Sequence, residues 1–362
     1  MYATLACQPS KILTHSLYSP SVTALPRSFR VRLKNLFKVV QKSCTSSEPH
    51  HEPVLLTECL EFLNLKEGSV VVDATLGLGG HSSEILKRIG ASGFLYAFEK
   101  DEENLKVAKE RLNKVASEMK TPGRFKIFHD SFSSLTDRLR REGVSQVDAF
   151  LFDLGLSSPH VDDSSRGFSF TKDGPLDMRF DRSKGKTAED ILNNASQEEL
   201  ADIFYKFGEE RFARKLASAV ILDRKKEKFV STLQFASFVE RVLGRGKPGK
   251  HRATQIFQAL RIAVNEELLA LELGLNQAIE LLAPHGRVVV LSYHSLEDRF
   301  TKHFFKQLAT DLRDPNDIFG RRVLRSKRLS LLTIKPIRPT EEEVGRNFRA
   351  RSALLRAVEK LS

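Results

Sequence analysis

Cysteine is rare in this chain, and long apolar runs are missing. The 362 residues include three cysteines, Cys7, Cys44 and Cys59, none of which forms a CxxC spacing. This argues against a disulfide framework and a zinc site, and it suits a reducing compartment. The longest apolar runs, such as Arg287–Tyr293, have the length of a strand, whereas a membrane helix needs roughly 20 residues. We therefore expect no membrane partner.

Acidic residues are scarce in three stretches, and the net charge is +12. Residues 1–50 hold seven Lys or Arg against one acid, Arg241–Arg252 holds no acid, and Arg313–Arg351 holds eleven Lys or Arg against five acids. This pattern favours a polyanionic partner, with an ordinary solvated surface as the alternative. Residues 1–50 also resemble an organellar transit peptide, and a disordered extension of a bacterial protein is the alternative.

From residue 51 onward, strand and helix patterns alternate. Four apolar runs, ending near residues 73, 99, 129 and 153, predict strands separated by helices, which is typical of a parallel, doubly wound α/β sheet. Between residues 161 and 251 only helical segments are found. Residues 254–283 are then predicted to be helical, followed by a strand, a helix and two strand-like runs. The predicted division is an extension (1–50), a sheet domain in two parts (51–160 and 252–362) and an inserted helical domain (161–251).

The stretch "VVVDATLGLGGHSSEIL" predicts a strand, a glycine turn and a helix, an arrangement that binds nucleotide-like cofactors. Asp73 ends the strand, and Gly77, Gly79 and Gly80 form the turn. Dinucleotide sites usually show GxGxxG, whereas this turn reads GxGG after "DAT". A carboxylate at this position repels a pyrophosphate but pairs with a cationic, amino-bearing ligand. The turn therefore favours S-adenosylmethionine.

Two further carboxylates end predicted strands. Glu99 follows Gly77 by 22 residues and is placed to accept hydrogen bonds from ribose hydroxyls, and Asp153 ends the fourth strand. Any one of these acids could be a helix cap or a loop residue. Three acids at strand ends, where ligands bind in such sheets, predict a class I S-adenosylmethionine-dependent methyltransferase fold.

The stretch Phe150–Asp181 is rich in loop-forming residues and is the predicted acceptor side. Methyltransferases that act on exocyclic amines place a short motif after the fourth strand, and we expect Asp153 to accept a hydrogen bond from the amine, to bind the cofactor, or both. A base must leave its stack to reach such a pocket. Ser157, Ser158 and Pro159 are candidates for the rim. Three phenylalanines could stack on a base but are more often core residues: Phe168, Phe170 and Phe180.

A second dense stretch, Val288–Phe300, places polar side chains after a buried strand. His294 is a candidate for assisting proton loss from the amine, with a structural histidine as the alternative. No Ser/His/Asp or Cys/His set has the spacing of a hydrolase. The sequence also shows no metal-ligand spacing, and we expect no metal.

Seven motifs appear in the order of one family, and together they cover residues 51–360. They resemble the MraW-type small-subunit ribosomal RNA methyltransferases: "HEPVLLTECLEFLNL", "VDATLGLGGHSSEIL", "DLGLSSPHVDDSSRGFSFTKDGPLDMRFD", "YKFGEERFARKLA", "ATQIFQALRIAVNEEL", "GRVVVLSYHSLEDR" and "RARSALLRAVEK". The resemblance implies methylation of N4 of one cytidine in the decoding region of small-subunit ribosomal RNA, with the assembled subunit as substrate. The cofactor contacts that it implies fall on Gly79, Gly80, His81, Glu99, Phe132, Asp153 and His160.

The chain departs from the family pattern at five positions. Leu78 replaces a frequent arginine, Glu99 a usual aspartate and His160 a usual glutamine; Arg252 replaces a proline and Gln255 an arginine. Glutamate can still accept the ribose hydrogen bonds, whereas the change at His160 bears on a cofactor contact. The last two changes lie outside the cofactor motifs and bear on the RNA surface.

Other functions remain as alternatives. A DNA or protein methyltransferase would share the fold, an RNA-binding assembly factor would keep the fold without turnover, and a nicotinamide oxidoreductase is disfavoured by the turn spacing. The expected compartment is a bacterial cytoplasm, or a mitochondrion or chloroplast if residues 1–50 are a transit peptide. The sequence leaves monomer and homodimer open.

Overall fold

A computed structural model describes residues 53–120, 124–246, 251–314 and 322–362. The predicted extension over residues 1–50 lies outside the described residues, so its transit-peptide interpretation and the compartment stay predictions. The fold below is that of residues 51–362, one compact unit. Among the described residues, no helix is both long and apolar enough to cross a membrane.

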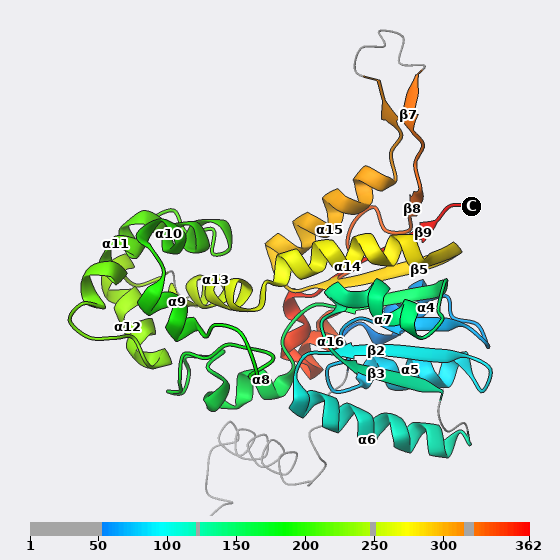
Figure 1. Ribbon diagram of the computed structural model, residues 1–362, viewed down its shortest axis with the longest axis horizontal. Coiled ribbons are helices and arrows are strands. Elements are labelled where there is room, and N and C mark those ends of the chain that lie inside the picture. Colours follow the sequence, from blue (N-terminus) through cyan, green and yellow to red (C-terminus); the bar gives the residue numbers. More distant parts are fainter. Residues whose placement is uncertain (1–52, 121–123, 247–250, 315–321) are drawn as a thin grey trace, which may run out of the picture. The chain divides into compact units, whose positions relative to one another are not determined.

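Seven strands form the main sheet of the described chain, in the order β3-β2-β1-β4-β5-β9-β8. The strands from β3 to β5 are parallel, whereas β9 runs antiparallel to both of its neighbours. This is the order of class I methyltransferases, and the predicted fold class is confirmed (Figure 1). The strands are β1 (Val70–Asp73), β2 (Phe94–Glu99), β3 (Phe125–His129), β4 (Val147–Asp153), β5 (Leu282–Ser292), β8 (Leu329–Leu331) and β9 (Leu354–Lys360).

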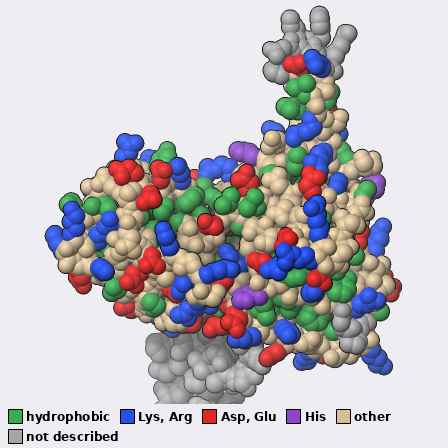
Figure 2. Space-filling model, in the orientation of Figure 1, with side chains coloured by type: hydrophobic (Ala, Val, Ile, Leu, Met, Phe, Trp, Pro, Cys, Tyr) green, Lys and Arg blue, Asp and Glu red, His purple; other side chains and the backbone are tan. Residues whose placement is uncertain are grey.

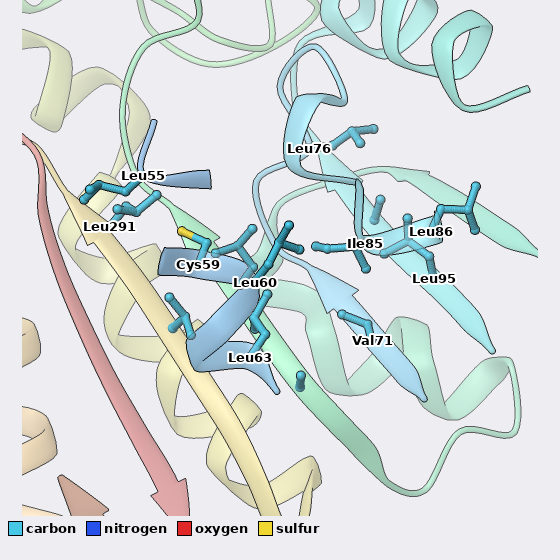
Figure 3. Packing of buried hydrophobic residues seen from close by; sticks show 14 of the residues in the cluster. Leu55, Cys59, Leu60, Leu63, Val71, Leu76, Ile85, Leu86, Leu95 and Leu291 are labelled. Atoms are coloured by element: carbon cyan, nitrogen blue, oxygen red, sulfur yellow. The ribbon is translucent and has the colours of Figure 1, made fainter. Parts of the chain in front are cut away.

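Helices cover both faces of the sheet because strand side chains alternate between two apolar clusters. Val71 points into one cluster (Figure 3), which also contains Leu151. Val72, Phe150 and Phe152 point into the other. The first cluster is covered by α4 (Leu56–Leu63), α5 (Gly80–Ile89) and α6 (Glu102–Glu118). The second is covered by α7 (Leu135–Arg141), α14 (Glu267–Leu281) and α15 (Ser295–Leu308).

Helices inserted between β4 and β5 bury a third apolar cluster of their own, which includes Phe204 and Phe235 (Figure 1). Capping boxes at Thr187, Ser196 and Ser231 start three of these helices. The group comprises α9 (Ala188–Asn194), α10 (Gln197–Lys206), α11 (Ala213–Asp223), α12 (Thr232–Leu243) and α13 (Ala253–Asn265). Because α13 packs into this cluster, the helical group extends beyond the predicted boundary at residue 251.

The stretch over residues 254–283 is helical as predicted, but it forms two helices, and its last two residues already belong to β5. Glu266 has a φ of 52°, in the left-handed region, and it ends α13 and begins α14. The neighbouring Asn265 side chain is buried and donates to the carbonyls of Met178 and Arg261, while its oxygen accepts from the N–H of Phe180. Tertiary contacts of Asn265 therefore fix the break between α13 and α14. The spacing of apolar residues in the sequence does not indicate this break.

Short elements complete the described chain. After α15, the strands β6 (Leu312–Arg313) and β7 (Val323–Arg325) pair as a hairpin that the sequence did not predict. Before β9 come α16 (Glu341–Arg346) and the 3-10 turn η4 (Phe348–Ser352). Three more short segments follow β3 and β4: η2 (Phe132–Ser134), α8 (Ser158–Asp162) and η3 (Ser164–Arg166).

We predict that Asn265→Ala lowers the free energy of unfolding by about 1–3 kcal/mol, because it leaves buried backbone groups without partners. Asn276→Ala is the matched control, because the Asn276 amide donates only to a carbonyl on an exposed part of α14. Urea denaturation of both variants measures the difference. Equal stabilities for the two variants would contradict the role given to Asn265.

Candidate active site

The three predicted carboxylates lie at one edge of the sheet. Asp73, Glu99 and Asp153 are the last residues of β1, β2 and β4, and β1 lies between the other two. Asp73 pairs in register with Ala97 on one side and Leu151 on the other. The carboxyl ends of parallel strands are where ligands bind in such sheets. The structure therefore brings together acids that are up to 80 residues apart in the sequence.

Asp73 stabilises the glycine turn through hydrogen bonds of its side chain. It is fully buried, its Oδ2 accepts from the Ser82 hydroxyl at 2.7 Å, and its Oδ1 accepts from the Thr75 N–H at 3.0 Å. Burial raises the pKa of this carboxyl. Both oxygens thus have partners within the turn, and direct contact of Asp73 with a cofactor stays a prediction.

The glycine turn leaves the start of α5 open. Gly79 is the N-cap with a φ of 77°, a conformation that favours glycine, and no side chain caps the helix. A Cβ on Gly80 would lie 2.6 Å from Cγ of Pro53, so a side chain has no room there. Uncapped N–H groups at a helix start bind anionic groups. This fits the carboxylate of an amino-acid moiety.

Glu99 is a half-buried carboxyl that accepts hydrogen bonds from backbone N–H groups. Its Oε1 accepts from the N–H of Asp101 at 2.8 Å, and backbone N–H groups of Gly77 and Lys100 also face it. Burial nevertheless raises its pKa to about 8, with Asp101 adding repulsion. A carboxylate that its own protein solvates poorly gains from hydroxyl donors. The position and chemistry of Glu99 therefore fit the ribose contact that the sequence predicts.

Phe132 lies where the third strand ends, and its ring packs into the core. The ring meets Phe152 edge-on at a centroid distance of 5.5 Å, and a Cβ on Gly274 would lie 2.6 Å from it. A pocket of about 280 Å³ next to this residue is lined by the neighbouring Ser131 and Ser133, by Lys100 and by the start of α14. The pocket lies beyond the ends of β2 and β3. A cofactor contact of Phe132 stays a prediction.

Asp153 is held from two sides. The Tyr293 hydroxyl donates to its Oδ1 at 2.7 Å, and Nδ1 of His81 lies 3.4 Å from its Oδ2. Its N–H donates to the Thr75 hydroxyl at 2.5 Å, which ties the end of β4 to the turn after β1. Gly155 makes room for the tyrosine, because a Cβ there would lie 2.9 Å from its ring. The carboxylate is thus fixed in orientation while its side chain stays 24% exposed.

His81 is a buried imidazole beside this carboxylate. Burial alone would lower its pKa, but hydrogen bonds with Asp153 and with the thiol of Cys59 raise the pKa well above the usual range. Its Nε2 lies 3.0 Å from the carbonyl of Val54, so both ring nitrogens have acceptors when the ring is protonated. Asp153 therefore faces the site as a paired carboxylate.

Tyr293 was not predicted from the sequence. The residue lies within the stretch Val288–Phe300, which drew attention through His294 and its acids. The register could have suggested it, because Asp153 pairs with Leu291 and Tyr293 lies two residues further along the same edge.

His160 belongs to a buried polar cluster. Its Nε2 donates to Oδ2 of Asp101 at 2.8 Å, and its ring lies 5.1 Å from the rings of both Phe168 and Phe180. Arg166, also buried, pairs with the same carboxylate at 2.5 Å. Burial opposes ionisation of Asp101, but these two donors hold its pKa well below the usual range. The cluster fastens the loop after β4 to the start of α6.

The phenylalanines of the acceptor loop are core residues. Phe168 is buried in the cluster of the helical group, and Phe170 and Phe180 pack against it half-buried. Phe170 also meets Phe257 of α13 edge-on, with ring centroids 4.8 Å apart. The structure therefore supports the core alternative over base stacking for all three rings.

His294 is the N-cap of α15. Its Nδ1 accepts from the N–H of Glu297 at 3.4 Å, and its Nε2 lies 3.1 Å from Oε1 of the same residue. The side chain is 9% exposed. The cap fits the structural alternative, but Nε2 is buried without a hydrogen-bond partner among the described residues, so assistance of proton loss stays a prediction.

Three potential metal ligands, Glu267, His294 and Glu297, come together from α14 and α15 with ligand atoms within 4.8 Å of one another. No sequence spacing suggested this cluster. Arg261 pairs with both oxygens of Glu267 at 2.8 and 2.9 Å, and Oε2 of Glu297 accepts from the N–H of Tyr293. The carboxylates of Glu267 and Glu297 thus already have hydrogen-bond partners within the protein.

Comparisons with known proteins assign the chain to a family. A sequence model of the MraW methylase family matches residues 48–361. The chain belongs to the MraW methylase family. Ribosomal RNA small subunit methyltransferase H of Halothermothrix orenii is 43% identical over 314 residues, which cover 86% of this chain and 98% of that protein. The protein of the same name from Thermomicrobium roseum is 46% identical over 316 residues, or 86% and 94% of the two chains.

Among solved structures, an rRNA methylase from Streptococcus thermophilus covers 88% of this chain and 100% of its own, with 13% identity and a TM-score of 0.37. The first 47 residues of this MraW methylase precede the family match. Membership of a methylase family confirms S-adenosylmethionine as the cofactor. The turn at Gly79 and the carboxyl of Glu99 fit its amino-acid and ribose moieties.

We predict that binding of S-adenosylmethionine at pH 7 releases up to one proton. With a pKa of about 8, Glu99 is mostly protonated in the free protein, whereas ribose hydroxyls donate to the ionised form and lower that pKa. Affinity should therefore rise with pH and level off above about 8. Calorimetry in two buffers of different ionisation enthalpy measures the release.

The matched control for this prediction is Glu99→Gln, which keeps the shape of the side chain and cannot titrate. Binding to this variant should release no proton from position 99 and should not strengthen with pH. The same proton release from both proteins, or none from the unchanged protein, would contradict the assignment of Glu99.

Proposed function

We propose that this MraW methylase transfers a methyl group from S-adenosylmethionine to the N4 amine of a cytidine in the decoding region of small-subunit ribosomal RNA, with the assembled subunit as substrate. The relatives from Halothermothrix orenii and Thermomicrobium roseum carry the name of a small-subunit ribosomal RNA methyltransferase. The observation that carries the proposal is the oriented carboxylate of Asp153 beside the cofactor turn. The amine and its position in the RNA rest on the family motifs.

The exocyclic amine of cytosine is a poor nucleophile because its lone pair is delocalised into the ring. The bound cofactor supplies a methyl group on a sulfonium, which already makes a good leaving group. The chain must therefore chiefly position the amine and stabilise the charge that it gains. The Asp153 carboxylate can accept a hydrogen bond from the amine N–H, which aligns the lone pair and takes up part of that charge.

Tyr293 and His81 act through Asp153 as positioning residues. The tyrosine hydroxyl fixes one carboxylate oxygen, and the protonated imidazole neutralises the other side. A carboxylate held in this way needs little rearrangement when the amine arrives, which is the main advantage of a preorganised site. Because the two partners come from α5 and from the segment after β5, the orientation depends on the fold of the whole sheet edge.

The charge distribution supports a nucleic acid as substrate. Lys and Arg side chains are spread over the helical group and the β6–β7 hairpin on the face in view (Figure 2). Such surfaces bind phosphates without reading the sequence. The helical group contributes exposed arginines, including Arg211, Arg214 and Arg241.

Gene deletion tests the proposed substrate and Asp153 together. We expect small-subunit ribosomal RNA from the deletion strain to lack one N4-methylated cytidine, and the unchanged gene to restore it. Asp153→Asn should lower the rate of transfer by about 10²–10³-fold, because an amide no longer offers a charged acceptor. Mass spectrometry of the nucleosides and fragments of the RNA measures both.

Two outcomes would count against these assignments. If the cytidine keeps its methyl group after deletion, the proposed RNA is wrong, and methylated DNA or protein becomes the place to look. If Asp153→Asn restores the modification at the normal rate, the amine is held by another group. Equilibrium binding of S-adenosylmethionine to the variant shows whether any loss concerns the cofactor.

A pair of variants separates the two roles of His294. Asparagine is a good N-cap and alanine is not, so His294→Ala should destabilise the protein by about 1 kcal/mol, whereas His294→Asn should be nearly neutral. We expect both to keep kcat, because the ring contacts Glu297 within its own helix. A matching loss of kcat in both variants would instead give His294 a part in proton transfer.

A further inference from the structure

The turn η4 lies at the same edge of the sheet as Asp153. Strand β9 runs antiparallel to β5, with Leu354 opposite Ser292, so the residues before β9 lie where β5 ends. Ala350 and Ala353 are fully buried and anchor the turn from beneath. Since Tyr293 follows Ser292 directly, this edge is the one that holds the acceptor carboxylate.

A second contact ties η4 to the loop after β4. Arg349 pairs with Oδ1 of Asp162 at 2.7 Å and donates to the Ser158 hydroxyl. Both partners belong to α8, which begins five residues after Asp153. In Figure 1, α16 and α8 both appear at this end of the sheet. Two independent links therefore place η4 at the rim of the acceptor side, where Ser158 was expected.

The rim carries an aromatic ring that is open to solvent. Phe348 is 68% exposed, and no other aromatic side chain in the described ranges is more so. The guanidinium of Arg351 lies 4.1 Å from the centre of its ring and donates weakly to its carbonyl. The exposed ring of Phe348 contributes little buried apolar surface to the fold, and it has no evident structural role.

The charges around the ring suit RNA. Residues 335–351 contain five basic side chains against three glutamates, and one of these, Glu343, already accepts from the N–H of Leu55. Aromatic rings and arginine planes are the groups on which unpaired nucleobases stack. When a base leaves its stack to reach a catalytic pocket, its neighbours lose a stacking partner. A nucleobase that has lost its stacking partner has a suitable size to stack on the ring of Phe348, and the charge of its nucleotide suits the basic side chains around this ring.

We propose that Phe348, with Arg351 stacked on it, is a platform for an unpaired nucleobase of the RNA next to the nucleotide that is methylated. The inference rests on the proposed function for the nature of the polymer. It adds a substrate-binding site outside the cofactor and acceptor residues: Phe348 directly precedes the last of the family motifs quoted above, which begins at Arg349 and includes Arg351.

The chain contains no tryptophan, so Phe348→Trp introduces a single tryptophan at the platform, whose emission can be excited selectively. Addition of protein-free small-subunit ribosomal RNA should quench its emission, because a base stacks on the indole. Val107→Trp is the control, because Val107 is likewise exposed, at 46%, but belongs to α6 and not to η4. RNA binding, followed separately by filter retention, without a change specific to Phe348→Trp would overturn the proposal. Quenching by small-subunit proteins but not by RNA would overturn it as well.

Kinetics with small ribosomal subunits that lack the modification provide the second measurement. Phe348→Ala should raise KM for the subunit about tenfold, with kcat and the affinity for S-adenosylmethionine unchanged. Phe348→Tyr should restore KM, and Val107→Ala should not change it. An unchanged KM for Phe348→Ala would contradict the platform. RNA could quench Phe348→Trp specifically while the unsubstituted protein transfers no methyl group. This result would support the platform and refute the proposed reaction.

Discussion

The site depends on one carboxylate whose direction is fixed by residues from three other parts of the chain. Asp153 receives a hydrogen bond from Tyr293 after β5, pairs with His81 of α5, and is tied through its backbone to Thr75 after β1. These partners meet only because β1, β4 and β5 are adjacent and in register. The orientation of the acceptor group is therefore a property of the sheet, and the loop alone would not provide it.

The three strand-end carboxylates have the same location but different surroundings. Asp73 is enclosed by its own turn, Glu99 is half-buried and accepts from backbone N–H groups, and Asp153 is paired yet partly exposed. Differences in burial and in available hydrogen-bond donors thus give the three carboxylates different roles. Asp73 holds the turn, Glu99 is suited to a ligand's hydroxyls, and Asp153 is suited to the acceptor amine.

Much of the fold could be predicted from the sequence, because each strand and helix of the sheet domain carries its own periodicity. The strand ends at Asp73, Glu99 and Asp153 followed directly from those patterns. The break at Glu266 did not, since it is set by the contacts of Asn265 with residues some 85 positions away. The inclusion of α13 in the helical group was missed for the same reason, because packing decides it.

The site was predictable only in part. Residue types at strand ends indicated where a ligand binds, but they did not reveal which side chains meet there. Tyr293 went unnoticed beside His294, although the tyrosine contacts Asp153 and the histidine caps a helix. His160 stands where the family usually has glutamine, and it is accommodated by contacts with Asp101 and two phenylalanine rings. These contacts come from separate segments of the chain.

The most direct test of the central claim is a crystal structure of the protein with S-adenosylhomocysteine. The account predicts the ribose hydroxyls at Glu99, the amino-acid end at the turn of Gly79 and Gly80, and the sulfur on the side of Asp153 that faces solvent. A ligand bound away from this edge, or an Asp153 carboxylate turned from Tyr293 and His81 in the complex, would contradict it.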